Sequence, residues 1–336
     1  MVTREANCNI SKFTTFHLPV IADEFIEYDS INELIDIVKE LKRDNRRYLH
    51  LGGGSNMLFS SRYDGAVLHC RCSEIRQLER NASHALIHVA SGTVWDDFVK
   101  YTVANDLYGA VNLSYIPGEV GGAAVQNVGA YGSEAKDIVE SVEVLDTVDM
   151  HPKKLPLDEC CYGYRDSVFK HCPGRYIVTG VTFRLGVVPM YSLEYGPLKE
   201  LADHPGLSLA MVRERIISIR QSKLPEPSEL GSAGSFFKNP VVDRSKYEEL
   251  EASYPGMPYY DLPDGTVKIP AGWLIETSGL KGNRIGGAEV YTKQCLVIVN
   301  TGNASAEDVL ALKSFVQNTV RAKFGIDLLP EVNIVE

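Results

Sequence analysis

The sequence lacks any long hydrophobic run. A membrane-spanning helix needs about 20 consecutive apolar residues. No stretch of the 336-residue chain approaches that length, although 44% of its residues are hydrophobic. The N-terminal sequence MVTREANCNISKF is polar and has no apolar segment of the kind found in signal peptides. We therefore expect a cytoplasmic protein that does not enter a membrane.

Positive charge is also scarce. The chain has 34 Lys and Arg against 44 Asp and Glu, which gives a net charge of −10 at pH 7. No basic run is long enough to form a nucleic-acid-binding stripe, so nucleic acid is not an expected partner. Because the overall field repels anions, an anionic ligand would have to be held locally, by backbone amides and a few basic side chains.

Paired cysteines are missing as well. The seven cysteines are an odd number, and none has the Cys-x-x-Cys spacing of a zinc site. The sequence therefore predicts reduced thiols and no bound metal. The cysteines stand at positions 8, 70, 72, 160, 161, 172 and 295.

Helical and strand patterns are both present, in a chain that exceeds the usual size of one hydrophobic core. Ser30 and Glu33 form a capping-box pattern ahead of a helical face made by Ile31, Leu34, Ile35, Val38 and Leu41. Further helices are expected where Val94, Phe98 and Tyr101 recur, from Val212 to about Lys223, and between Ser305 and Gly325. Strands are expected at residues 48–51, 66–70, 85–90, 138–145, 176–185 and 295–300.

Two glycine-rich loops carry the strongest local signal. One runs from Gly52 to Asn56, and the other, from Tyr115 to Gly132, holds five glycines and three alanines. Such passages let backbone amides approach a ligand closely and form concavities that attract phosphate. A flexible surface loop is the alternative, but the bulky Val120 argues against it. Neither loop fits G-x-G-x-x-G or a P-loop, so the pair indicates a pyrophosphate held between lobes in a flavin dinucleotide site of another type.

Three polar residues are uninformative when taken singly. Ser235, in GSAGSFFKNP, is either a turn residue or, with Lys238, the Ser-x-x-Lys pair of an acyl enzyme. The Ser-Asp-Asn and Lys-Thr-Gly motifs that accompany that pair are absent. Arg165 adjoins Asp166 and could form a solvated ion pair. Glu331 follows a proline before an apolar strand, where a partly buried carboxylate would need a partner.

Taken together, eight segments resemble one family, the UDP-N-acetylmuramate dehydrogenases, also called UDP-N-acetylenolpyruvoylglucosamine reductases. The segments span about residues 14–335 in the family's order, and their combination is far more specific than any one of them. Tyr195, in LEYGPL, resembles the tyrosine of the family's longer type, to which we assign the chain. The segments are GGGSNML, SGTVW, IPGEVGGAAVQNVGAYG, YGYRDSVFK, IRQSKLP, GSAGSFFKNP, AGWLIETSGLKG and LLPEV.

The resemblance implies an α+β fold with an FAD-binding domain of the vanillyl-alcohol-oxidase type, also called PCMH-type. That domain would consist of two lobes, at residues 1–70 and 71–215. A C-terminal α/β substrate-binding domain would occupy residues 216–336 and close over a sugar nucleotide, and its C-terminal tail would return toward the flavin. The prolines of LPEPSEL, directly after Lys223, mark a natural boundary near that junction.

The resemblance also implies a function. A monomeric enzyme would use FAD as cofactor and NADPH as co-substrate to reduce UDP-N-acetylglucosamine enolpyruvate to UDP-N-acetylmuramate. This step belongs to peptidoglycan precursor synthesis and so to cell wall biogenesis, cell shape, the cell cycle and cell division. Another FAD-dependent oxidoreductase of the same fold is the alternative, but it has no reason to require Ser235, Arg165 and Glu331 together. A scaffold without chemistry would leave both glycine-rich loops unexplained.

The family's functional residues can be carried over position by position. The resemblance assigns catalysis to Arg165, Ser235 and Glu331. It assigns substrate binding to Tyr164, Tyr195, Lys223, Asn239 and Gln294, with Gln294 near the uridine diphosphate end. FAD contacts are expected from Gly52, Gly53, Gly54, Ser55, Asn56, Met57, Pro117, Gly118, Gly121, Gly122, Ala123, Gln126, Asn127, Gly129, Ala130 and Tyr131.

Two positions depart from the family's pattern. Thr14 stands in Thr-Thr-Phe where the family usually has Asn-Thr-Phe, which alters one local contact. Glu119 occupies a loop position more often filled by a small residue. Because a carboxylate that points into a pyrophosphate site would repel the ligand, we predict that the Glu119 side chain faces away from the phosphates.

Overall fold

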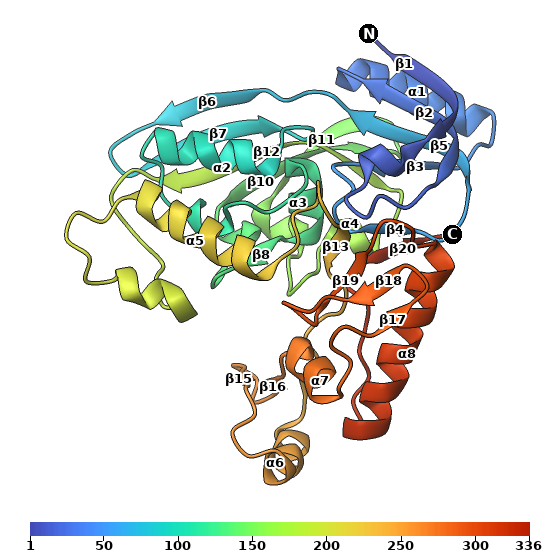
Figure 1. The fold of residues 1–336 in the computed structure, drawn as a ribbon. Coiled ribbons are helices and arrows are strands. Elements are labelled where there is room, and N and C mark those ends of the chain that lie inside the picture. Colours follow the sequence, from blue (N-terminus) through green and yellow to red (C-terminus); the bar gives the residue numbers. More distant parts are fainter. The chain divides into compact units, whose positions relative to one another are not determined.

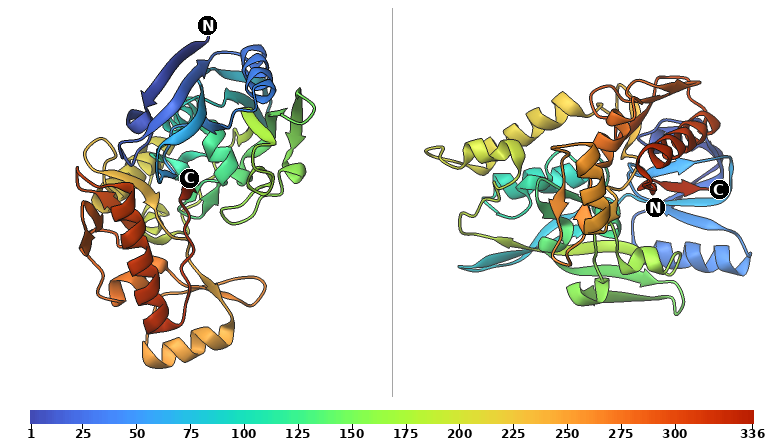
Figure 2. Two further views of the ribbon diagram at one scale, coloured as in Figure 1. Left: turned by 90° about the vertical axis from the view of Figure 1, so that its right-hand side faces the viewer. Right: turned by 90° about the horizontal axis from the view of Figure 1, so that it is seen from below.

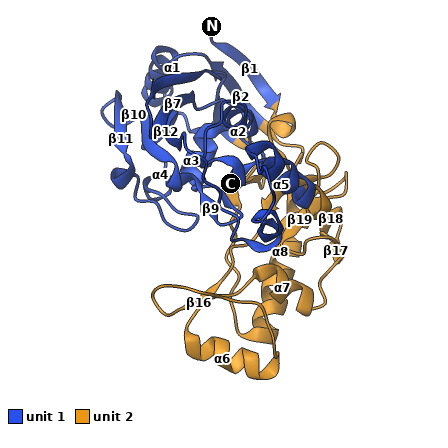
Figure 3. Cartoon of the chain, turned by 90° about the vertical axis from the view of Figure 1, so that its left-hand side faces the viewer, with its two compact units in different colours: residues 1–8, 22–54, 64–220 blue, residues 9–21, 55–63, 221–336 orange.

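Figure 1 traces residues 1–336, all of which are described in this computed structural model of the chain. The fold is α+β and consists of two compact units, coloured separately in Figure 3. Unit 1 comprises residues 1–8, 22–54 and 64–220, and unit 2 comprises residues 9–21, 55–63 and 221–336. Each unit therefore gathers stretches that are far apart in the sequence.

The first sheet of unit 1 has four strands in the order β1-β2-β5-β3. Strands β3 and β5 run parallel, with Tyr48 opposite Ala66, as expected when a helix or a further strand connects two neighbours. Helix α1 packs against this sheet (Figure 1). The bounds are β1 Thr3–Asn9, β2 Ile21–Tyr28, α1 Ile31–Arg43, β3 Tyr48–Leu51 and β5 Tyr63–Cys70.

Helix α1 begins at the capping pattern seen in the sequence. The Ser30 hydroxyl accepts a hydrogen bond from the Glu33 amide at 3.3 Å, and the Glu33 carboxylate accepts one from the Asp29 amide at 2.8 Å. The buried stripe, which supplies most of the helix's stability, differs slightly from the predicted one. Ile31 and Ile35 are only partly buried, and the buried residues are Leu34, Ile37, Val38 and Leu41.

The second sheet of unit 1 has five antiparallel strands in the order β11-β10-β12-β7-β6. Val181 of the central strand pairs with residues of both neighbouring strands, so the middle of the sheet is fully hydrogen-bonded. Helices α2 and α3 cover its apolar face. The bounds are β6 Ile75–Arg80, β7 His84–Ala90, α2 Trp95–Ala104, α3 Val120–Gln126, β10 Val139–Asp146, β11 His151–Pro156 and β12 Tyr176–Gly186.

Helix α2 buries only part of the face that the sequence predicted. Phe98 is fully buried and Tyr101 packs at the edge of the core, but Val94 precedes the helix and is 48% exposed. Trp95 takes its place in the core: its ring lies 5.5 Å from that of Phe98, which stacks on Phe183 of β12 at 4.3 Å. An aromatic stack of this kind adds to the stability gained from area burial, which explains why the helix turns Trp95 rather than Val94 inward.

The remaining elements of unit 1 surround this core. Helix α5 buries Leu209, Val212, Ile216 and Ile219, which includes the predicted face. The Arg213 guanidinium holds the Asp96 carboxylate through two hydrogen bonds of 2.8 and 2.7 Å. The bounds are β8 Gly129–Ala130, β9 Ser133–Glu134, α4 Val168–His171 and α5 Leu209–Lys223, with short 3-10 helices at Val111–Leu113, Ala135–Asp137, Leu157–Cys160 and Gly196–Leu201.

Unit 2 is built on a four-stranded sheet in the order β13-β19-β18-β17, beside which the long helix α8 lies (Figure 2). Strand β19 is buried throughout, as its apolar sequence predicted. Helix α8 begins at a capping box of Ser305 and Asp308 and ends at Gly325, whose φ of +66° suits a glycine C-cap. The bounds are β13 Gly231–Ser235, β17 Arg284–Ile285, β18 Ala288–Val290, β19 Val297–Asn300 and α8 Ala306–Phe324.

Unit 2 also contains a small sheet and a pair of parallel strands. The small sheet has the order β14-β16-β15. The C-terminal strand β20 pairs with β4, Asn333 lying opposite Met57, so the end of the chain lies beside the residues that follow Asn56. The bounds are β4 Met57–Phe59, β14 Val241–Val242, α6 Arg244–Ser253, β15 Tyr260–Asp261, β16 Val267–Lys268, α7 Ala271–Thr277 and β20 Asn333–Val335, with a 3-10 helix at Ile10–Phe13.

The structure also bears on the expectations drawn from composition. All seven cysteines are free. No group of three or more His, Cys, Asp and Glu side chains is arranged to hold a metal ion. None of the helices combines the length and the apolar character that a membrane span requires.

Candidate functional site

In unit 1, residues 52–54 of the first glycine-rich loop lie against the second loop. A Cβ atom on Gly53 would lie 2.8 Å from the Cα of Gly118, closer than two carbons can approach without displacement. A Cβ on Gly52 would lie 3.4 Å from a carboxylate oxygen of Glu119. The close approach of the loops therefore depends on the missing side chain at residue 53.

The second loop is held in place by the segment after β7. The amide of Val120 donates to the carbonyl of Thr93 at 2.9 Å, and the amide of Gly121 donates to the carbonyl of Ser91 at 2.8 Å. Beside Gly122, by contrast, a Cβ would meet no atom within 4 Å. The stretch from Tyr115 to Gly132 is thus an ordered turn and helix with one open side, and the alternative of a flexible surface loop is wrong.

Two buried hydroxyl groups beside this loop have no protein partner. They are Oγ of Ser91 and Oγ1 of Thr93, and the Cβ of Ser91 lies 2.9 Å from where Gly121 would carry a Cβ. Buried hydroxyls almost always find a hydrogen-bond partner, so this pair and the open side at Gly122 together fit a polar ligand such as a pyrophosphate. Sequence reasoning assigned no role to SGTVW, although hydroxyl residues in a turn between a strand and a helix were the available signal.

The side chain of Arg165 contacts the backbone that directly follows α3. Its guanidinium donates to the carbonyls of Gly129 at 3.1 Å and Asn127 at 3.5 Å. Its φ is +54°, a conformation that non-glycine residues rarely adopt. Lys170 stabilises it by donating from Nζ to the Arg165 carbonyl at 2.9 Å and to Oε1 of Gln126 at 3.0 Å. The backbone around Arg165 is therefore fixed directly to the glycine-rich stretch.

Two of the predicted substrate-binding tyrosines lie in the same region of unit 1. The Arg165 guanidinium lies 5.8 Å from the centre of the Tyr164 ring. The Tyr195 ring meets the Tyr131 ring edge to face at 5.9 Å, and the Cβ of Tyr195 lies 3.6 Å from where Gly132 would carry a Cβ. Tyr164 and Tyr195 are 38% and 42% exposed, so both rings have apolar surface available for a ligand.

In unit 2, Ser235 and Glu331 lie on neighbouring stretches of chain although 96 positions separate them. Ser235 ends β13, and the carbonyl of the next residue, Phe236, accepts a hydrogen bond from the Glu331 amide at 2.8 Å. The Asn56 side-chain amide donates to the Glu331 carbonyl at 3.2 Å. Phe236 and Phe237 are fully buried, so the pairing is backed by an apolar core. The structure thus brings two of the predicted catalytic residues and one predicted FAD contact together.

Two other predicted substrate-binding residues flank the start of α7. Oδ1 of Asn239 accepts a hydrogen bond from the Ala271 amide at 2.9 Å. Oε1 of Gln294 lies 2.8 Å from where a Cβ on Gly272 would stand, so Gly272 leaves room for the amide side chain. Lys223 is the last residue of α5 and is exposed. Asn239 and Gln294 therefore both lie beside the start of α7 in unit 2, and a joint action of the residues from the two units stays a prediction.

Comparison with known proteins gives matches to both parts of the chain. The profile described as "UDP-N-acetylenolpyruvoylglucosamine reductase, C-terminal domain" matches residues 226–335, and that described as "FAD binding domain" matches residues 22–149. A UDP-N-acetylenolpyruvoylglucosamine reductase of Bacteroides fragilis (strain YCH46) is 46% identical over 98% of this chain and 100% of its own length. The protein of the same name from Neisseria gonorrhoeae (strain ATCC 700825 / FA 1090) is 44% identical over 97% of this chain and 95% of its own.

A solved structure shows the same fold. The crystal structure of UDP-N-acetylenolpyruvylglucosamine reductase from Thermus caldophilus superimposes with a TM-score of 0.70 and 26% sequence identity. The match covers 100% of this chain and 99% of that one. The similarity therefore extends over both units and is not confined to a single shared domain.

Proposed function

The chain belongs to the UDP-N-acetylenolpyruvoylglucosamine reductase family, and we propose that Arg165, Ser235 and Glu331 carry its chemistry. Its fold is that of an FAD-binding domain of the vanillyl-alcohol-oxidase type followed by a C-terminal substrate-binding domain. It is an FAD-containing, NADPH-dependent oxidoreductase that reduces UDP-N-acetylglucosamine enolpyruvate to UDP-N-acetylmuramate in peptidoglycan precursor synthesis. The further assignment of lobes to residues 1–70, 71–215 and 216–336 is part of the proposal.

The glycine-rich loops of unit 1 are the part of the chain that fits FAD. The observation that carries this assignment is the 2.8 Å approach at Gly53 and Gly118, next to an open side at Gly122 and the orphaned hydroxyls of Ser91 and Thr93. These groups offer amide and hydroxyl donors to a pyrophosphate. FAD, when bound, supplies the hydride chemistry that no amino-acid side chain can perform, taking hydride from NADPH for delivery to the enolpyruvyl group.

Arg165 and Glu331 are proposed to control charge on the substrate. Hydride addition to the terminal carbon of the enolpyruvyl group pushes electrons onto its carboxylate and gives an enolate-like species. Arg165 remains charged and presents a planar set of donors, which suits a developing enolate carboxylate. Glu331, in its protonated form, donates to the same group. Both assignments are supported by the fixed backbone on which each residue lies.

Ser235 is proposed to protonate the neighbouring carbon. A serine hydroxyl is normally a weak acid, so its surroundings must favour the alkoxide, or a water relay must restore the proton quickly. Its place at the end of β13, before two fully buried phenylalanines, supports a fixed orientation of the hydroxyl. The acyl-enzyme alternative, with Lys238 as partner of Ser235, predicts a colourless protein that β-lactams label.

The remaining predicted residues are proposed to bind substrate. Asn239 and Gln294 present amide groups around the start of α7, and Tyr164 and Tyr195 present half-exposed rings. Lys223 offers a cation to a phosphate group. The net charge of −10 supports an enzyme that does not bind nucleic acid. A monomeric state, a cytoplasmic location and the absence of membrane binding are further parts of the proposal.

The proposed function is tested first by the colour of the protein. The purified chain should be yellow, NADPH should bleach its flavin absorbance under anaerobic conditions, and UDP-N-acetylglucosamine enolpyruvate should restore it. A colourless protein, or a reduced flavin that this substrate fails to reoxidise, would contradict the assignment.

The role of Ser235 is tested by measuring the two half-reactions separately in Ser235→Ala. Reduction of the flavin by NADPH should proceed at the wild-type rate, because no proton transfer to substrate is involved. Reoxidation by the enolpyruvyl substrate should slow by about 10²- to 10⁴-fold, the usual contribution of a general acid. Ser314→Ala is the control, since that hydroxyl only bonds to the Leu310 carbonyl within α8 at 2.9 Å. An unimpaired second half-reaction in Ser235→Ala would remove Ser235 from the mechanism.

A further inference from the structure

The glycine-rich cradle consists of the two loops at residues 52–56 and 115–132. A carboxylate lies directly beside it, where its charge would repel an anionic ligand. Glu119 precedes α3, and its side chain is only 12% exposed. One carboxylate oxygen, Oε2, lies 3.4 Å from where Gly52 would carry a Cβ, a point that is also 3.8 Å from the amide nitrogen of Gly122. The Glu119 carboxylate, which belongs to the second loop, therefore lies close to Gly52 of the first loop. At such low exposure its charge is poorly screened by solvent.

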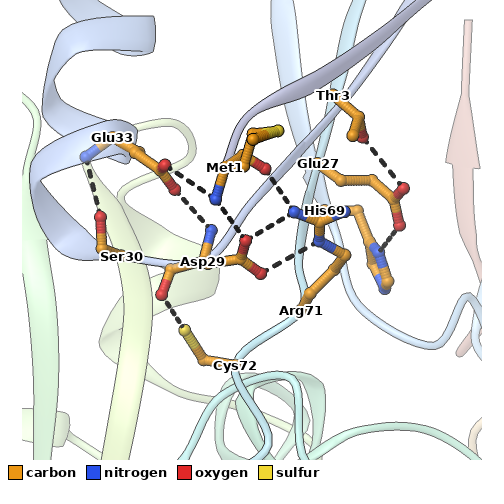
Figure 4. Close-up of polar contacts among 9 residues, drawn as sticks. All are labelled: Met1, Thr3, Glu27, Asp29, Ser30, Glu33, His69, Arg71 and Cys72. Atoms are coloured by element: carbon orange, nitrogen blue, oxygen red, sulfur yellow. Dashed lines mark hydrogen bonds and ion pairs between the residues drawn. The ribbon is translucent and has the colours of Figure 1, made fainter.

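The other oxygen of this carboxylate is bound by a histidine. Nε2 of His69, on β5, lies 3.0 Å from Oε1 of Glu119, and the His69 side chain is 15% exposed. On its opposite side, Nδ1 of His69 lies 3.3 Å from Oε1 of Glu27. Figure 4 shows the imidazole directed at Glu27, whose second oxygen accepts a hydrogen bond from the Thr3 hydroxyl at 3.2 Å. His69 thus bridges two carboxylates from different elements.

Two further side chains next to His69, those of Phe25 and His50, carry no positive charge near pH 7. The Phe25 ring stacks on the imidazole with centroids 5.9 Å apart. His50, on β3, is hydrogen-bonded to the Tyr28 hydroxyl at 2.7 Å. Desolvation, reinforced by repulsion from His69, lowers the pKa of His50 to about 4, so that His50 is neutral near pH 7. Arg71 is a further cation near this cluster, because it attracts Glu27 electrostatically. His69 is the cation that contacts Glu119 directly.

The protonation of His69 follows from the same contacts. Burial lowers the pKa of His69, but the hydrogen bond and charge of Glu119, followed by those of Glu27, outweigh it, and the net pKa is raised above 6.5. Interactions that depend on the imidazolium are therefore fully present below about pH 6.5 and are lost as the pH rises through the raised pKa.

We propose that His69 is a positioning residue for the FAD site. It holds the Glu119 carboxylate in one orientation and balances its charge, so that the glycine-rich loops accept a pyrophosphate next to a residue that would otherwise repel it. This inference rests on the proposed function. It has a thermodynamic consequence, because a ligand whose binding is favoured by a protonated group is held less tightly once the proton is lost.

The test follows the release of FAD from diluted holoenzyme by flavin fluorescence between pH 6 and pH 9. In the wild type, release should become about tenfold faster across this range, because one pKa unit of coupling corresponds to a factor of ten. Glu119→Gln keeps the size of the side chain and removes its charge, so its release rate should be slow and independent of pH. His69→Gln should release FAD about tenfold faster than the acidic wild type at every pH.

The double variant His69→Gln/Glu119→Gln separates charge balance from structural support. With the carboxylate gone, the imidazolium is no longer needed, and slow, pH-independent release should return. His84→Gln is the matched control. Nε2 of His84 lies 3.6 Å from Oε1 of Glu79 in the same unit, at the end of β7 remote from Ser91, and this variant should keep the wild-type pH profile.

Two results would overturn the inference. One is a Glu119→Gln protein that retains the wild-type pH dependence, and the other is a double variant that loses FAD as fast as His69→Gln. If His69→Gln does not fold, the profile of Glu119→Gln alone still decides. Failure of the proposed function is a separate outcome. In that case the wild type would carry no flavin, or NADPH would not bleach it. If only this inference fails, the wild type is still yellow and bleached by NADPH, and Glu119→Gln releases FAD with the same pH dependence as the wild type.

Discussion

The glycine-rich cradle of unit 1 and the Ser235–Glu331 pair of unit 2 are constructed by opposite means. In the cradle, Gly53 and Gly118 are 65 positions apart in the sequence, and yet a single Cβ on Gly53 would lie 2.8 Å from the Cα of Gly118. In the pair, main-chain hydrogen bonds bring two side chains onto adjacent stretches, with Phe236 accepting from the Glu331 amide. The first site depends on the absence of a side chain at Gly53, and the second depends on the functional groups of Ser235 and Glu331.

This difference indicates how each site should respond to substitution. Adding one carbon to the cradle should disturb structure before chemistry, because the interior is close-packed and has no room to relax. Removing one functional group from the pair should disturb chemistry and leave the fold intact, since the main chain does the positioning. Arg165 is the informative exception, because it lies in unit 1 beside the cradle and yet is proposed to act through its side chain.

Among the substitutions in unit 1, Arg165→Ala should give the largest effect. If the guanidinium stabilises the enolate-like species, flavin reoxidation by the enolpyruvyl substrate should slow by about 10²- to 10³-fold, the usual cost of losing one such donor. Flavin reduction by NADPH should change little. Rapid mixing under anaerobic conditions measures both steps. Arg165 would then behave like the residues of the pair, although it is in the other unit.

The matched control for this variant is Arg184→Ala. Arg184 is also in unit 1 and makes two hydrogen bonds to the Glu140 carboxylate, at 2.7 and 2.8 Å, but both side chains are half-exposed at the surface. Such pairs contribute little to stability, so both half-reactions should proceed at wild-type rates. Equal losses in both half-reactions of Arg165→Ala would indicate that the residue supports the loop, through its bonds to Gly129 and Asn127, and not the chemistry.

Gly53→Ala should give the next largest effect, on stability. Neither Gly53 nor Gly122 has a positive φ, so substitution tests space alone. The added carbon at residue 53 would collide with Gly118 and should lower the free energy of unfolding by about 1–3 kcal/mol. Gly122→Ala, with nothing within 4 Å of its Cβ, should leave the protein as stable or slightly more so, because alanine favours the helix.

The measurement for this pair is the urea midpoint of the FAD-free protein, which removes any effect on ligand binding. A Gly53→Ala protein as stable as the wild type would mean that the loops move apart easily, and the contrast between a tightly packed cradle and a tolerant pair would be lost. An equal loss of stability in Gly122→Ala would be equally damaging.

The cradle was accessible from the sequence because its signal is local. An excess of glycine and alanine in two short stretches predicts backbone exposed to a ligand whatever the rest of the chain does. Helix ends were accessible for the same reason. Ser30 and Ser305 lie at the N-caps of α1 and α8, and Gly325 lies at the C-cap of α8, as their positions in the sequence predicted.

The pair in unit 2 was not accessible by physical reasoning from residues, because its signal is long-range. Ser235 and Glu331 are separated by 96 positions, and nothing near either one indicates the other. Only the resemblance to a family suggested a common role. The partnership of His69 with Glu119 was missed for the same reason, since a charge imbalance is visible only when both side chains have been placed. Which of Ile35 and Ile37 would be buried depended likewise on tertiary packing, which overrides periodicity at the edge of a helical stripe.

The smallest effects are expected at the serine N-caps, a feature that α1 of unit 1 and α8 of unit 2 have in common. Ser30 and Ser305 each accept a hydrogen bond from the amide three residues on, at 3.3 and 3.1 Å. Replacing either by alanine should lower the free energy of unfolding by about 1 kcal/mol. Asp308→Ala should cost more than Ser305→Ala, because its carboxylate accepts from the amides of both Ser305 and Gly287, at 3.0 and 3.1 Å.

Urea titrations of the three variants, with Ser314→Ala as a surface control that should change stability little, measure these differences. Because each variant loses one N-cap hydrogen bond, the two serine variants should lose similar amounts of stability, about 1 kcal/mol each. If Ser305→Ala were far more costly than Ser30→Ala, the cap of α8 would be coupled to the Gly287 turn as a single network. The cap of α8 would then depend on a contact with Gly287, which is distant in the sequence, and could not be counted as a purely local signal.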